Sequence, residues 1–114
     1  MPYVSTKVNI KITEEKEEII RTKLSKAIEA ILGKSENWIM HSFEDEHSLY
    51  FRGSKSEPTA FIEVKLFGKA SGEAYNKMTG EITDIISSVL GINPLRVYVK
   101  YEETPYWGWN GNNF

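Results

Sequence analysis

The sequence repeats one pattern of elements at an interval of 58 residues, and this repeat constrains the fold more than any other feature of the chain. Ile31-Leu32-Gly33 and Val89-Leu90-Gly91 are separated by that interval, and each closes an amphipathic stretch that a polar link and an apolar segment follow. Self-similarity of this kind marks a repeated supersecondary unit. The 114 residues therefore predict a single domain, 1–114, made of pseudo-repeats over about 1–58 and 59–114.

In the first half, a strand is predicted from Tyr3 to Lys11, because apolar and polar residues alternate there. An amphipathic helix follows, with Thr13 as its N-cap and Gly33 at the left-handed position that ends many helices. A second strand is predicted over Trp38–Phe43, and a short extra strand over Leu49–Phe51.

The second half repeats this order. It predicts a strand over Thr59–Phe67, a helix that Ser71 caps and Gly91 ends, and a closing strand over Arg96–Tyr101. Two β-α-β units in one chain predict an α+β two-layer sandwich, in which a four-stranded mixed sheet carries both helices on one face.

The other face of this sheet has no helix to cover it. Phe, Trp, Tyr, Ile and Val occur in the strands, so we expect a large apolar surface that serves as an interface, with a closed ring of subunits as one solution. The tail Thr104–Phe114 contains four large aromatic residues and is expected to be ordered, packed either on its own domain or on a neighbouring subunit.

Composition excludes several classes of function. The chain has no cysteine, so disulfides, thiol catalysis and thiolate metal sites are ruled out, and its two histidines are too few and too poorly placed for a metal site. A net charge of −2 does not favour nucleic acid as a partner. The sequence has no membrane-length apolar run and no signal-peptide core, so we expect no membrane insertion and a cytoplasmic location.

The chain begins with Met1-Pro2, which is a candidate catalytic feature. Removal of the methionine would leave Pro2 with a free secondary amine, and an ordinary terminal amine titrates near ~7.7–8.0. An apolar pocket or a nearby cation lowers such a pKa, and a base poised near neutral pH suits proton transfer beside a carbonyl. The alternative is an ordinary start of the chain without a chemical role.

Several short pieces, in this order and at these intervals, carry a family resemblance: Met1-Pro2, Leu32-Gly33-Lys34, Phe51-Arg52-Gly53-Ser54, Glu57-Pro58, Leu66-Phe67-Gly68, Arg96-Val97-Tyr98, Gly108-Trp109-Asn110 and Phe114. Over its whole length the chain resembles the macrophage migration inhibitory factor (MIF) family of the tautomerase superfamily. The resemblance implies a homotrimer in which three sheets form a barrel with the helices outside. It also implies keto–enol tautomerisation of arylpyruvates such as phenylpyruvate, or of dopachrome, in pockets between subunits, without a cofactor or metal.

The resemblance assigns a role to three residues besides Pro2, the catalytic base. Lys34 matches the lysine that binds the substrate carboxylate, although a surface lysine at a helix end is the alternative. Phe67 stands where the family usually has an isoleucine whose backbone amide touches the substrate. Tyr98 matches a tyrosine that reaches the substrate ring from the adjacent subunit, or else it is a core residue.

Other positions depart from the family pattern. Lys100 replaces an asparagine on the same strand face as Tyr98, and an ammonium group can only donate hydrogen bonds, so it favours more acidic substrates over hydroxylated arylpyruvates. Bulky residues are expected to line the pocket, namely Tyr3, Trp38, Trp107 and Phe114.

Two other hypotheses remain open at this stage. One is a cytokine-like protein, secreted without a signal peptide, that binds a cell-surface receptor and has weak or vestigial tautomerase activity. The other is dehalogenation or decarboxylation of a small acid in the same pocket.

Overall fold

The computed structural model describes residues 1–114 and contains the two repeated units that the sequence predicts. The elements, in chain order, are β1 (Pro2–Val8), α1 (Glu14–Leu32), η1 (Glu36–Trp38), β2 (Met40–Glu44), β3 (Ala60–Phe67), α2 (Gly72–Leu90), η2 (Pro94–Arg96), β4 (Val97–Thr104), β5 (Gly108–Trp109) and β6 (Asn112–Asn113). The fold is therefore the predicted α+β sandwich, with a small hairpin added at the C-terminus.

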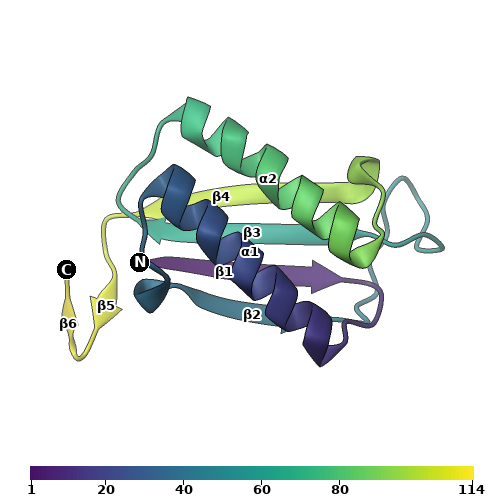
Figure 1. Ribbon diagram of the computed structural model, residues 1–114, viewed down its shortest axis with the longest axis horizontal. Helices are drawn as coiled ribbons and strands as arrows, with labels where there is room; N and C mark the ends of the chain where they lie inside the picture. Colours follow the sequence, from purple (N-terminus) through teal and green to yellow (C-terminus); the bar gives the residue numbers. More distant parts are fainter.

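The four long strands form one mixed sheet in the order β2-β1-β3-β4. Each repeat supplies one parallel pair, β1 with β2 and β3 with β4, and the repeats join through the antiparallel pair of β1 and β3. Figure 1 shows both helices on the same face of this sheet. The N-terminus and the C-terminal hairpin lie at one end of the sheet, and the loop between β2 and β3 lies at the other.

The two helices have the same kind of N-cap and the same kind of C-terminal residue, as the repeat predicts. The hydroxyl of Thr13 accepts a hydrogen bond from the amide of Lys16, and that of Ser71 accepts one from the amide of Ala74. Gly33 and Gly91 end the helices with φ values of 68° and 69°, in the left-handed region that residues with a Cβ rarely adopt.

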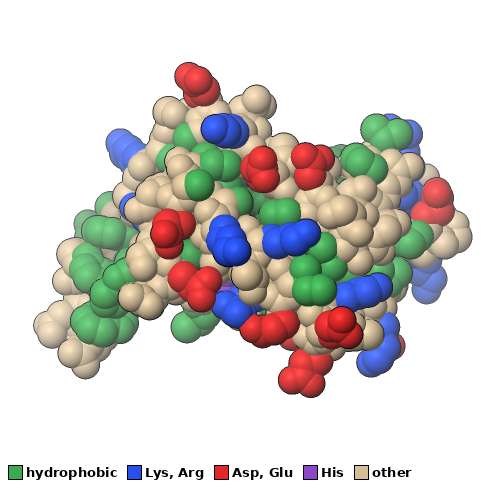
Figure 2. All heavy atoms as spheres, in the orientation of Figure 1, with side chains coloured by type: hydrophobic (Ala, Val, Ile, Leu, Met, Phe, Trp, Pro, Cys, Tyr) green, Lys and Arg blue, Asp and Glu red, His purple; other side chains and the backbone are tan.

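The core lies between the sheet and the helices. Its largest fully buried side chains come from all three layers and are Ile20, Leu24, Ile28, Ile62, Leu66, Met78, Ile82, Ile86, Ile92, Val4, Val8 and Val64. On the outer side of the helices, charged side chains are scattered among apolar ones, whereas hydrophobic side chains gather over the C-terminal hairpin (Figure 2). Neither α1 nor α2 contains an apolar stretch of the length and hydropathy that a membrane-spanning helix needs.

The open face of the sheet differs from the expected apolar surface. Strand residues alternate between faces, so the Val and Ile side chains point towards the helices, and aromatic, charged and hydroxyl side chains remain on the other side. Ion pairs form there between Lys7 and Glu44 (3.5 Å) and between Lys100 and Glu102 (2.9 Å). The open face is therefore mixed in character, and its apolar side chains are aromatic apart from Met40 at the start of β2, which is 68% exposed.

Several predicted boundaries were wrong. β1 ends at Val8 because Asn9 turns its side chain to the loop, where Oδ1 accepts from the amide of Thr59 (2.8 Å). Trp38 lies in the 3₁₀ turn η1 rather than in a strand. Leu49–Phe51 forms no strand, only an isolated bridge from Phe51 to Ser54. The last strand is longer than predicted and extends to Thr104.

Candidate active site

A hollow of about 540 Å³ opens at the end of the sheet where the chain begins. It is built from the start of β1, from the segment around η1 and from the C-terminal hairpin, and its lining residues are Met1, Pro2, Tyr3, Asn37, Trp38, Ile39, Met40, Trp107, Gly108 and Trp109. Four of the predicted site residues thus meet here: Pro2, Tyr3, Trp38 and Trp107. A groove of about 580 Å³ between α1 and α2 is slightly larger, but it is lined by the outer faces of the helices and contains none of the predicted residues.

Pro2 is held in this hollow by the sheet. It is the first residue of β1, it is buried, and it pairs with Leu66 of β3. The carbonyl oxygen of Met1 accepts a hydrogen bond of 3.2 Å from the backbone amide of Phe67. With Met1 attached, the nitrogen of Pro2 is part of an amide, so the free amine in the hollow belongs to Met1. The Met1 acyl group therefore uses the same amide donor that the resemblance assigns to substrate binding.

Lys34 lies close to the chain terminus because it follows the left-handed Gly33 that ends α1. Burial lowers the pKa of the N-terminal amine, and the positive charge of Lys34 lowers it further. Lys34 is half-buried and forms no ion pair with an acidic side chain. Its charge is therefore available to an anion near the N-terminus, although its side chain does not line the hollow itself.

The tail packs on its own domain and builds one wall of the hollow. The ring of Trp109 meets Trp38 edge to face at 5.0 Å, and Phe114 stacks on Trp109 at 6.3 Å. Phe114 also contacts Phe67 at 5.6 Å, and its amide donates to the carbonyl of Trp107 (3.0 Å). Phe114 thus packs against Trp109 and Phe67 and does not line the hollow itself.

Besides Met1, sequence reasoning missed five contributors to this hollow: Asn37, Ile39, Met40, Gly108 and Trp109. A signal for Trp109 was present, because it is one of four large aromatic residues in the tail and lies two positions after Trp107. Asn37 and Met40 carry no comparable signal, since they reach the hollow only because η1 turns the chain beside β1.

Tyr98 and Lys100 do not reach this hollow in the same chain. Tyr98 pairs with Phe61, which lies five residues along β3 from the partner of Pro2, a separation of about 17 Å at ~3.3 Å per residue. Tyr98 lines a second cavity of about 210 Å³ at the far end of the sheet. Lys100 bonds Glu102, and this hydrogen bond and the charge of Glu102 raise the pKa of Lys100.

Comparison with known proteins shows which proteins this chain is similar to in sequence and in fold. The family model for macrophage migration inhibitory factor (MIF) matches residues 1–114. Macrophage migration inhibitory factor of Xenopus laevis is 25% identical over 116 residues, which cover 100% of this chain and 99% of that protein. The crystal structure of Leishmania major MIF2 is 32% identical with a TM-score of 0.94, over 100% of this chain and 97% of that one.

Two further structures extend the comparison. The homologue from Prochlorococcus marinus is 27% identical with a TM-score of 0.89, over 98% of each chain. A fused 4-OT symmetric trimer shares the fold at 16% identity, with a TM-score of 0.86 over 97% of this chain and 94% of that one.

Proposed function

The chain belongs to the macrophage migration inhibitory factor family, and from that premise we propose that it is a keto–enol tautomerase of arylpyruvate-like 2-keto acids. Membership of this family supports an isomerase activity in general. One observation supports the more specific proposal of this substrate class. The chain terminus lies in a hollow with aromatic walls, close to Lys34, which has no acidic partner, and to the backbone amide of Phe67.

The base is the amine of Pro2 after removal of Met1. β1 fixes the proline ring in place, so the amine needs no further positioning. Burial and Lys34 lower the pKa of the Met1 amine, and the same surroundings act on an amine one residue further in. A lowered pKa increases the unprotonated fraction of the amine near neutral pH, and the unprotonated amine is the form that accepts a proton.

The hydrogen bond between Met1 and Phe67 indicates how a substrate would be held. Once Met1 is absent, the amide of Phe67 is free to donate to a substrate oxygen, and the ammonium of Lys34 attracts the carboxylate. Pro2 then takes a proton from C3 of the 2-keto acid, the electrons of that C–H bond form the C2–C3 double bond, and the electrons of the C2=O π bond move onto oxygen. The protonated amine then gives the proton to this enolate oxygen, which yields the enol. The fixed donors stabilise the charge that develops on oxygen.

The proposed active site also requires a homotrimer, because two of its residues come from a neighbouring subunit. Tyr98 and Lys100 belong to the pocket in the family pattern, yet they lie about 17 Å along the sheet from Pro2 of the same chain. Tyr98 is 57% exposed, so it is free to contact another subunit. We therefore assign Tyr98 and Lys100 to the pocket of a neighbouring subunit, in a ring with three such sites. Sedimentation equilibrium should give three times the chain mass of 13.1 kDa, and a monomer would contradict the assignment.

The decisive experiment measures ketonisation of phenylpyruvate by protein whose intact mass confirms the loss of Met1. Pro2→Gly should lower kcat about 10²- to 10⁴-fold, the usual contribution of a general base. Lys34→Ala should raise KM about ten- to a hundredfold through the loss of a charged hydrogen bond. Lys23→Ala, on the outer groove, is the matched control and should have no effect. Equal rates for Pro2→Gly and wild type would remove Pro2 from the mechanism.

A further inference from the structure

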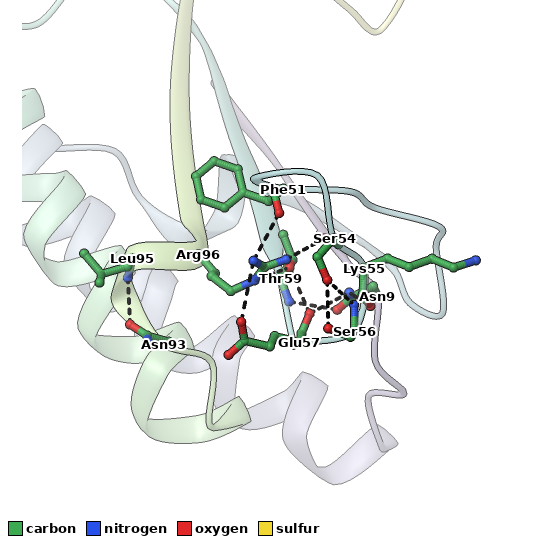
Figure 3. A network of polar contacts seen from close by, with 10 residues as sticks. All are labelled: Asn9, Phe51, Ser54, Lys55, Ser56, Glu57, Thr59, Asn93, Leu95 and Arg96. Atoms are coloured by element: carbon green, nitrogen blue, oxygen red, sulfur yellow. Dashed lines mark hydrogen bonds and ion pairs between the residues drawn. The ribbon is translucent and has the colours of Figure 1, made fainter.

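The loop between β2 and β3, residues 45–59, has almost no regular structure, but hydrogen bonds from Asn9 and Arg96 anchor it to the domain (Figure 3). Connections of this length without secondary structure are uncommon in compact domains and are often functional. Asn9 donates to the carbonyls of Lys55 (3.4 Å) and Glu57 (2.9 Å) and accepts from the amide of Thr59 (2.8 Å). Arg96 holds the other side of the loop.

Arg96 is 6% exposed and directs its whole guanidinium group at the loop. Its Nε donates to Oγ1 of Thr59 (2.9 Å), Nη1 to the carbonyl of Phe51 (3.2 Å) and Nη2 to the carbonyl of Ser54 (2.9 Å). The carboxylate of Glu57 lies 3.9 Å away and is largely exposed. A buried cation is costly unless its donors are satisfied, so this geometry ties the Phe51–Ser54 turn to the start of β4.

The turn held by Arg96 places the ring of Phe51. The guanidinium carbon of Arg96 lies 5.4 Å from the centre of that ring, and Phe51 in turn meets the ring of Tyr98 edge to face at 5.0 Å. Phe61 also meets the ring of Tyr98 edge to face, at 6.4 Å. Tyr98 is more than half exposed and its hydroxyl forms no hydrogen bond within the chain, so the two phenylalanine rings fix its orientation.

We propose that Arg96 is a positioning residue: through Phe51 it holds the ring of Tyr98 in the orientation that contacts the aromatic ring of a substrate bound to the neighbouring subunit. This inference rests on the proposed function. Arg96 touches no substrate. It contributes to the preference for aryl over alkyl 2-keto acids, because an alkyl group presents no ring for Tyr98 to contact.

The test compares KM for phenylpyruvate with KM for an unbranched alkyl 2-keto acid. Arg96→Lys keeps the charge but loses the planar fork, and Phe51→Leu leaves the backbone contacts of Arg96 in place. Each should raise KM for phenylpyruvate about three- to tenfold, the size of one aromatic pair, and leave kcat and the alkyl KM unchanged. Arg52→Lys is the matched control, since Arg52 also lies over the Phe51 ring (5.7 Å) but is exposed. Equal changes for both substrates would overturn the proposal.

A second readout does not depend on activity. Protein labelled with 3-fluorotyrosine gives a ¹⁹F resonance for Tyr98, which Tyr98→Phe assigns. That resonance should shift in Phe51→Leu and in Arg96→Lys and stay in place in Arg52→Lys. An unchanged resonance in Phe51→Leu would overturn the positioning role. If wild type has no activity on any 2-keto acid, the proposed function fails, and the resonance still decides whether Arg96 and Phe51 orient Tyr98.

Discussion

Acid should destabilise the protein through His41, a histidine of β2 that points under α1. Its Nε2 lies 2.9 Å from the hydroxyl of the buried Ser25, whereas its Nδ1 is buried without a hydrogen-bond partner. Burial lowers the pKa of His41, the nearby charge of Arg21 lowers it further, and Glu36 opposes this in part. The folded protein therefore binds a proton at His41 less readily than the unfolded chain does.

The sign follows from proton linkage. Between the unfolded pKa, near ~6.5, and the lower folded pKa, the unfolded chain carries more protons at this site than the folded protein. The contribution of His41 to the free energy of unfolding is therefore fully present above about pH 6.5. It is lost progressively as the pH decreases through this window. One proton limits the slope to about 1.4 kcal/mol per pH unit. Below the folded pKa, the contribution of His41 becomes constant.

Urea unfolding at pH 7.5, 6.0 and 5.0 tests this for wild type and His41→Gln, at one chain concentration because assembly affects apparent stability. The difference in unfolding free energy between the two should shrink as the pH falls. His47→Gln is the matched control, because His47 is exposed, and it should keep the pH dependence of wild type. Parallel curves for wild type and His41→Gln would refute the reasoning.

Three further substitutions test the site and the assembly. Trp109→Ala removes the ring that meets Trp38 and should raise KM for aryl substrates about three- to tenfold, while unchanged kinetics would exclude this wall from binding. Lys100→Asn should lower KM for 4-hydroxyphenylpyruvate relative to phenylpyruvate, with little change in unfolding free energy because its ion pair is exposed. Tyr50→Asp, beside the second cavity, should dissociate the trimer in sedimentation equilibrium, whereas Lys65→Asp on the open face should not.

The fold was predictable because local signals and the repeat agree. Thr13, Gly33, Ser71 and Gly91 all occupy the helix-end positions that the sequence indicates. The strand boundaries were not predictable to the same degree. β1 stops at Val8 because Asn9 bonds to a segment about fifty residues away, and no local pattern reports a contact of that range.

The site was predictable only in part for a related reason. Pro2, Tyr3, Trp38 and Trp107, which the family resemblance names, line one hollow, and their roles in it stay predictions. The contribution of Trp109 depends on how the tail folds at the end of the sheet, which the Gly- and Asn-rich sequence of the hairpin does not specify. The distance of Tyr98 from Pro2 follows from the strand register, which side-chain periodicity alone leaves undetermined.

The chemistry of the open face limits how three chains can assemble. Glu63, Lys65, Lys100 and Glu102 lie on that face, and stacking two such faces would remove these charges from water. Desolvating an ion pair can cost more than its attraction returns, so a dry face-to-face contact is unfavourable. The exposed rings of Tyr50 and Tyr98 instead lie at the far end of the sheet, beside the second cavity and next to the edge strand β4. Contacts made there leave the charged face in water and bring Tyr98 to a neighbouring chain, so the same geometry favours both the ring and a pocket shared between subunits.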